Sequence, residues 1–263
     1  METLLWDKDI EITGADIPVS TKEILFYSHF NQQIGPGVFP ESLETIMFGL
    51  YFDRPLVENV FPGSLKHIVF SWHFNQPIGP NVLPNSLISI IFGKKYSQPI
   101  AENVLPNSLK VIEFDNDFTH PFGPNVLPNS LKSIKLGYHY KYAVREMNLP
   151  DSIERLTLRS SHARSIHIED LPANLKYLYV FNVDSLKPLN SNPQLIYFNI
   201  IDIKCINSLH DITFPILHDS TLGITDGYEL ISTKTIEIDG KEYYKLINPE
   251  FYQPRSRAKS ARK

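Results

Sequence analysis

The sequence predicts a mainly β chain that winds into a parallel β-solenoid, and two regular spacings carry this prediction. Prolines recur at intervals of twenty-two residues, at Pro18, Pro40, Pro62, Pro84, Pro106, Pro128, Pro150 and Pro172. Serine stands two residues after each of the first seven prolines, at Ser20, Ser42, Ser64, Ser86, Ser108, Ser130 and Ser152. A constant period without insertions is typical of a chain whose turns are equal and stack on one another.

Each twenty-two-residue unit also repeats one apolar pattern after its proline. In the unit that begins at Pro128, the third, sixth and eighth following residues are Leu131, Ile134 and Leu136. This L-x-x-L-x-L spacing is typical of the strand segment in a leucine-rich-repeat-like coil. The twelfth residue is aromatic in six consecutive units, at Phe30, Phe52, Phe74, Tyr96, Phe118 and Tyr140. Because one coil cannot bury these side chains alone, neighbouring coils are expected to share one core.

Polar residues recur in the same phase. The serines are expected to tie the turn before each strand, as hydroxyls do at turns. Asparagine occupies one position in four successive units, at Asn59, Asn81, Asn103 and Asn125. Stacked amides at this spacing are expected to hydrogen-bond along the solenoid. Both rows are therefore interpreted as structural.

Several units carry F-N-x-P-I or a close variant, such as FNQQI at residues 30–34 and FNQPI at residues 74–78. Together with the L-P-x-S-L element and the period, these motifs resemble the FNIP-repeat family over roughly residues 12–200. This leucine-rich-repeat-like group is abundant in dictyostelid amoebae and giant amoebal viruses. The resemblance implies a repeat scaffold for protein–protein contacts and supplies no catalytic residues. For a viral member it implies the host cytoplasm.

The chain divides into four predicted segments. Residues 1–17 are expected to form an N-terminal cap and partial coil, and residues 18–203 the repeats, in eight or nine coils. Residues 204–253 are expected to cap the open end. Within them, residues 235–247 alternate around Asp239-Gly240, which predicts a β-hairpin that places Glu237 opposite Glu242. Residues 254–263 are predicted to be a disordered basic tail.

Composition points to an intracellular, cytoplasmic protein without membrane association. The net charge is −4, which gives no general attraction to nucleic acid or anionic lipid. The single cysteine, Cys205, cannot form an intrachain disulfide. The N-terminal segment is too charged for a signal peptide, and no apolar run reaches membrane-spanning length.

The sequence contains no convincing set of catalytic or metal-binding residues. His29, His73 and His139 share one position in their units but lie two and three coils apart, too far for one zinc ion. Glu58, Glu102 and Glu146 form a similar row, roughly 10 Å apart, with no sign of a cleft. We therefore expect a non-enzymatic protein with no cofactor, no metal and no small-molecule substrate.

The strand face that points away from the core is the candidate protein-binding surface. Its central row reads Leu25, Met47, Val69, Ile91, Glu113, Lys135, Thr157 and Tyr179. Glu113 and Lys135 are lateral neighbours and are expected to pair. The candidate residues are Met47, Val69, Ile91, Tyr51, Trp72 and Tyr27, because contiguous apolar and aromatic surface is typical of contacts. Two alternatives stay open: another part of the chain covers this face, or the face has no role.

The rival function is nucleic-acid association through the tail. Its five basic residues are Arg255, Arg257, Lys259, Arg262 and Lys263, with no acidic residue among them. Binding through so few charges would weaken steeply with salt. Solvation of the tail is the simpler interpretation, and nucleic acid is the less favoured partner.

Overall fold

The computed structural model confirms the solenoid. It describes residues 3–159 and 170–180, and the backbone of further strands up to residue 254. Ten strands form one parallel sheet in sequence order. They are β1 (Thr3–Trp6), β2 (Glu23–Phe26), β3 (Thr45–Met47), β4 (His67–Val69), β5 (Ser89–Ile91), β6 (Val111–Glu113), β7 (Ser133–Leu136), β8 (Arg155–Leu158), β9 (Tyr177–Val180) and β10 (Tyr197–Ile200).

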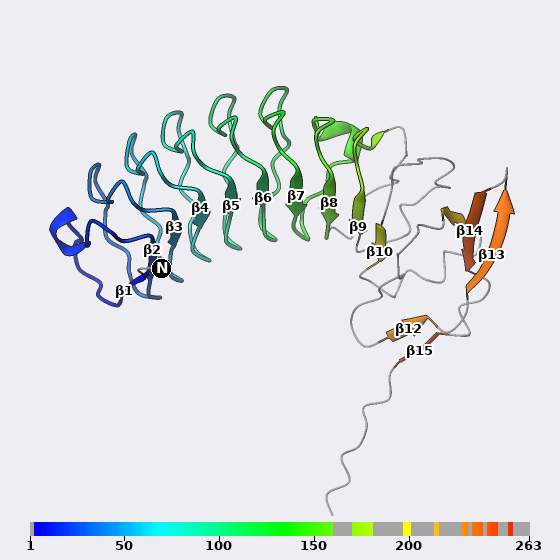
Figure 1. The fold of residues 1–263 in the computed structure, drawn as a ribbon, viewed down its shortest axis with the longest axis horizontal. Coiled ribbons are helices and arrows are strands. Elements are labelled where there is room, and N and C mark those ends of the chain that lie inside the picture. The colour runs from blue at the N-terminus through cyan, green and yellow to red at the C-terminus, as the bar shows by residue number, and fades with distance from the viewer. Residues whose placement is uncertain are drawn as a thin grey trace, which may run out of the picture.

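The coils stand side by side in a curved row, as Figure 1 shows for β2 to β8. The loops at the top of the view fan apart, and the strands lie nearer the inner side of the curve. Short 3₁₀ turns occur at Gly14–Asp16 and Val144–Glu146. Each coil contributes one strand of three or four residues to the sheet, and the rest of the coil returns the chain to the start of the next strand.

The first strand was not part of the sequence prediction. Strand β1 pairs in parallel with β2, and Trp6 lies beside Phe26 in the register. These two residues are separated by twenty positions instead of twenty-two. Trp6 is nevertheless buried, so it continues the inward apolar row of the repeats by one coil.

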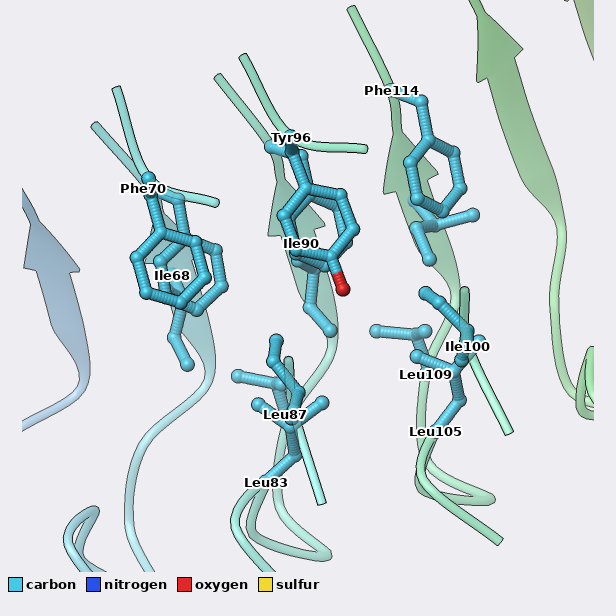
Figure 2. Close-up of a cluster of buried hydrophobic side chains, with 14 of the residues drawn as sticks. Ile68, Phe70, Leu83, Leu87, Ile90, Tyr96, Ile100, Leu105, Leu109 and Phe114 are labelled. Carbon is cyan, nitrogen blue, oxygen red and sulfur yellow. The ribbon is translucent and has the colours of Figure 1, made fainter. Parts of the chain in front are cut away.

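The core is built from the inward positions that the period identifies. The third and sixth residues after each proline are fully buried from Leu43 and Ile46 onward, and Ile24 begins the sixth-position row. Phenylalanine at the eighth position stacks on the aromatic residue at the twelfth, with ring centroids 4.1 Å apart for Phe48–Phe52 and 4.0 Å for Phe92–Tyr96. Figure 2 shows Phe70, Tyr96 and Phe114 gathered near one end of the strands and Leu87 and Leu109 near the other.

The same rings also stack from coil to coil. At the twelfth position the centroids of Phe52 and Phe74 are 6.1 Å apart, and those of Phe74 and Tyr96 are 6.0 Å apart. The planes of the second pair differ by 1°. Aromatic pairs at this range add to the stabilisation from burial. The result is one continuous interior that neighbouring coils share.

The serines join coils instead of closing their own turn. The Ser64 hydroxyl donates to the Leu43 carbonyl at 2.6 Å, and the Ser86 hydroxyl donates to the Leu65 carbonyl at 2.6 Å. Each bond crosses to the preceding coil. The serines therefore have the structural role that was predicted, and the carbonyl that each of these two hydroxyls satisfies lies just before the strand of the preceding coil.

The asparagine prediction was wrong in its mechanism. Asn59, Asn81, Asn103 and Asn125 are exposed, and all four have φ between 58° and 62°. This left-handed conformation is one that asparagine adopts more readily than most residues. No hydrogen bond links their side chains within the described coils, so the residue type is explained by the turn.

A true polar ladder follows the asparagine of the F-N-x-P-I motif. The Asn31 side-chain oxygen accepts from the Asp53 backbone N–H at 3.0 Å, and the Asp53 carboxylate accepts from the Asn75 N–H at 2.9 Å. Asn75 repeats the contact with the Ser97 N–H at 2.9 Å. One side-chain acceptor per coil thus satisfies a backbone donor in the next coil, where these turns are half-buried.

The backbone of consecutive coils comes close together at the ninth position, where glycine recurs in every second coil. A Cβ at Gly49 would lie 2.0 Å from the Tyr27 carbonyl oxygen, and one at Gly93 would lie 1.8 Å from the Ser71 oxygen. At Gly137 the corresponding distance to the Asp115 oxygen is 2.2 Å. Glycine is required here because the preceding coil occupies the space of any side chain.

Beyond the repeats, the structure describes separate strands. Strand β13 (Thr233–Ile238) pairs antiparallel with β14 (Lys241–Leu246), and Glu237 lies opposite Glu242, in the register expected for the hairpin. Strand β11 (Thr213–Pro215) adds to β14, and β12 (Tyr228–Leu230) pairs with β15 (Tyr252–Pro254). Cys205, the Asp239-Gly240 turn and residues 255–263 lie outside the described residues. The four predicted segment boundaries stay predictions.

Candidate functional site

An unbroken apolar row runs across the outward face of the first five strands. Parallel pairing aligns five side chains as direct neighbours, one per coil: Leu5, Leu25, Met47, Val69 and Ile91. We call these five residues the apolar row. Leu5 is 54% exposed and Met47 is 37% exposed, and the other three are half-buried. Their inward neighbours, such as Ile46 and Ile90, are fully buried, so the alternation of a strand fixes the outward direction of the row.

An ion pair ends the apolar row. Ile91 lies beside Glu113 in the register, and Glu113 lies beside Lys135. The Lys135 amine donates to the Glu113 carboxylate at 2.8 Å, which confirms the expected pair. The apolar surface is therefore limited to five coils.

Aromatic residues border the row just after the strands. Tyr27, Tyr51 and Trp72 are 53%, 44% and 44% exposed. The Tyr51 ring stacks between two histidines, with centroids 5.9 Å from His29 and 5.0 Å from His73. We call Tyr27, Tyr51, Trp72, His29 and His73 the aromatic rim. The stacking holds Tyr51 in place and lowers the entropy that binding would cost.

The Trp72 ring packs against the side-chain amine of Lys94. The Lys94 amine lies 4.8 Å from the ring centroid, within the range of a cation–π contact. The next coils continue with the ion pair between Lys95 and Asp117 at 3.0 Å, and His139 lies 3.6 Å from Asp117. Beyond the apolar row an aromatic residue returns on this border only at Tyr138, which is 44% exposed and packs on His139 within the described coils.

Lysines border the row on the other side, just before the strands. The fourth residues after the prolines form what we call the lysine rim: Lys22, Glu44, Lys66, Ile88, Lys110, Lys132, Glu154 and Lys176. Glu44 accepts from Lys22 at 2.9 Å and from Lys66 at 2.6 Å, and Glu154 accepts from Lys132 and Lys176, both at 2.9 Å. Lys110 forms no ion pair with any residue that the structure describes.

Paired lysines change the acidity of the rim carboxylates. Hydrogen bonds from Lys66 and Lys22 lower the pKa of Glu44 from 4.5 to about 2. Those from Lys132 and Lys176 lower the pKa of Glu154 to about 2 in the same way. Five lysines against two glutamates give the rim an excess of three positive charges, on a chain whose net charge is −4.

Metal-binding clusters are not found in the described part of the chain. Within it, no group of three or more His, Cys, Asp or Glu side chains could hold a metal ion. His29 and His73 stack on Tyr51 instead of converging on one point. Glu58, Glu102 and Glu146 are exposed, and the Glu146 carboxylate accepts from the Ala143 N–H at 2.9 Å. No helix among the described residues is long and apolar enough to cross a membrane.

The repeats match the family model described as FNIP Repeat at residues 10–51, 52–95, 96–139 and 118–161. These matches span more than half of the chain, and each covers two consecutive coils. The chain belongs to the FNIP-repeat family. The F-N-x-P-I and L-P-x-S-L elements are thus parts of the FNIP repeat, as the sequence analysis predicted.

A solved structure is similar to this FNIP-repeat protein. It is the protein CroV588, of the giant virus CroV, and its title reads "The crystal structure of CroV588 a novel circular LRR protein structure". The two are 31% identical, with a TM-score of 0.65 over 76% of this chain and 34% of that one. This chain therefore spans about a third of that protein's length. None of the curated proteins compared with the chain matches it.

The structure places all six predicted site residues on one face of the FNIP repeats. Met47, Val69 and Ile91 lie within the apolar row, and Tyr27, Tyr51 and Trp72 lie in the aromatic rim. Sequence reasoning missed Leu5, because β1 departs from the period. It also missed the lysine rim, although the signal was present: lysine at the fourth position in five units.

Proposed function

We propose that this FNIP-repeat protein is a non-catalytic scaffold that binds a partner protein through the apolar row and the aromatic rim. The observation that carries the proposal is the row itself: five apolar side chains in register on a surface that the core does not need. A strand face in water usually carries polar residues on its outward positions. Contiguous apolar surface rimmed by polar residues is typical of interaction sites.

The composition of the surface supports a protein partner. Tyrosine and tryptophan are enriched among residues that dominate binding energy, and three of them border the row. The repeat fold also presents an extended surface instead of a pocket, and such folds are typically non-catalytic scaffolds. The fold alone does not name the partner.

The test is affinity capture with three forms of the full chain, followed by mass spectrometry. The wild type is compared with Met47→Glu combined with Ile91→Glu, which places two carboxylates in the row. Val57→Glu is the matched control, because Val57 is 41% exposed but lies in the loop of the same coil as Met47. A partner that the wild type and Val57→Glu retain, and the double variant loses, supports the proposal. Identical partners for all three forms reject it.

A further inference from the structure

The spacing of the apolar row restricts what can lie on it. Consecutive members sit on adjacent strands, about 4.8 Å apart. From Leu5 to Ile91 the row crosses four such intervals, a length of about 19 Å. The Glu113–Lys135 ion pair closes one end, so an apolar partner segment of about this length is needed.

An α-helix laid across the strands matches this interval. A helix returns a side chain to the same face about every 5.4 Å, and about thirteen residues cover 19 Å. The mismatch with the row is about 0.6 Å per coil, or half an interval over the whole row. An extended strand repeats about every 6.6 Å and is out of step by a full interval after three coils. Helical anchors at i, i+4, i+7 and i+11 can therefore each contact one coil.

The charges on the two borders of the row indicate which flank of a bound helix is acidic. Beside the row the lysine rim reads Lys22, Glu44, Lys66 and Ile88, with Lys110 one coil beyond Ile91, and Glu44 is shared by the first two lysines. Lys110 has no ion-pair partner among the described residues and is exposed. On the opposite border, the Lys94 amine lies over the Trp72 ring, and the exposed Asp7 follows Trp6 as Tyr27 follows Phe26, so this border carries both signs of charge. From Lys22 to Lys110 the rim has three lysines and one glutamate, so carboxylates on the partner are favoured on the flank that faces it.

We infer that the occupant of the apolar row is an amphipathic α-helix of a partner protein, with acidic residues along the flank that faces Lys66 and Lys110. The inference rests on the proposed function and adds the class of partner to it. Apolar contacts along the row supply the affinity, and the rim sets the direction and the salt dependence. Because the apolar row ends at Ile91, only about three and a half turns of the helix can lie on this surface.

The test uses the full chain as bait for three displayed peptide libraries of sixteen residues. The first is a stabilised helix with random apolar residues at i, i+4, i+7 and i+11 and glutamates on one flank. The second is the same helix with lysines on that flank. The third is linear with a central proline, which a helix interior does not accommodate. Selected peptides are then titrated by fluorescence anisotropy against variants of the chain.

The expected result is enrichment from the acidic helical library. Binding weakens at least tenfold with Leu5→Glu or Met47→Glu and is unchanged with Val57→Glu. Lys110→Glu weakens it several-fold, and the loss becomes smaller as salt increases. Leu5 and Met47 are exposed, and the thermal melt of each variant verifies that the fold is kept.

Three outcomes overturn the inference. Row-dependent binders from the lysine-flanked or linear library leave the docking function standing and reject the acidic helix. Self-association of the wild type that Met47→Glu abolishes assigns the row to a second copy. Failure of every library to give a binder sensitive to Leu5→Glu or Met47→Glu rejects the inference, whereas the affinity capture described above decides the proposed function separately.

Discussion

Substitution of Gly93 by alanine tests how closely the coils are stacked. The new Cβ would lie 1.8 Å from the Ser71 carbonyl oxygen and 2.7 Å from the Trp72 Cα. Real Cβ atoms essentially never come closer than 3.0 Å to such an atom, so the contact must open by about 1.2 Å. Neither neighbour is a flexible side-chain tip, so the backbone of one coil has to move.

The size of the effect follows from what that movement breaks. The Lys95 N–H donates to the Trp72 carbonyl at 2.9 Å, and a shift of about 1.2 Å takes this bond beyond hydrogen-bonding range. Loss of the bond costs about 1 kcal/mol. Overpacking adds about 1–3 kcal/mol. We therefore expect Gly93→Ala to lower the free energy of unfolding by about 2–4 kcal/mol.

Gly79→Ala is the matched control for this prediction. No atom lies within 4 Å of a Cβ at Gly79, and its φ is not in the left-handed region. Alanine there restricts the unfolded chain and is expected to stabilise the protein by about 0.4–1 kcal/mol. Urea unfolding followed by circular dichroism measures both variants, with unchanged m-values showing that the exposed surface is the same. Equal midpoints for the two variants would refute the close stacking of coils at the ninth position.

Three further measurements follow from the described contacts. The hydroxyls of Tyr96 and Tyr140 are buried without a hydrogen-bond partner among the described residues, and burial raises the pKa of both. Tyr96→Phe is therefore expected to raise the unfolding free energy by about 1 kcal/mol, whereas Phe74→Tyr is expected to lower it by about 1–3 kcal/mol. Urea melts that show a destabilised Tyr96→Phe variant would contradict this. Lys66 and Lys22 lower the folded-state pKa of Glu44 from 4.5 to about 2, so the contribution of this carboxylate to stability is complete above pH 4.5 and is lost as the pH falls towards about 2. The melting temperatures of the wild type and Glu44→Gln should therefore converge across that window. A constant difference between them would disprove the linkage. Removal of residues 254–263 is expected to leave retention on immobilised RNA unchanged at moderate salt, and a clear loss of retention would favour the rival nucleic-acid function.

Much of the fold could be predicted because the period of the repeats also sets the register of the sheet. Once Leu43, Ile46 and Phe48 are assigned to the core, the alternation of the strand sends Met47 outward, and the same holds for each later coil. The same reasoning located six residues of the candidate site. Periodicity identifies which residues are equivalent, and equivalent residues in a solenoid lie on one line.

What could not be predicted depends on distances between coils. The carbonyl that accepts from Ser86 belongs to Leu65, and the donor that Asn31 satisfies belongs to Asp53. These contacts require the pitch of the solenoid, which a repeat length does not provide. Strand β1 was missed for another reason: Leu5 and Trp6 are recognised as members of the rows only when β1 is seen beside β2.

The outward face can now be separated from what folding requires. The inward neighbours Ile90 and Ile112 are equally buried, and Phe92 stacks on Phe114 at 5.0 Å, so the core continues unchanged across these two coils. On the outward side the same step replaces Ile91 with Glu113. A residue that changes from apolar to charged with no change in the coil is not selected by packing. Because the fold tolerates either residue at this position, the apolar row needs another explanation, and desolvation by a bound partner supplies one.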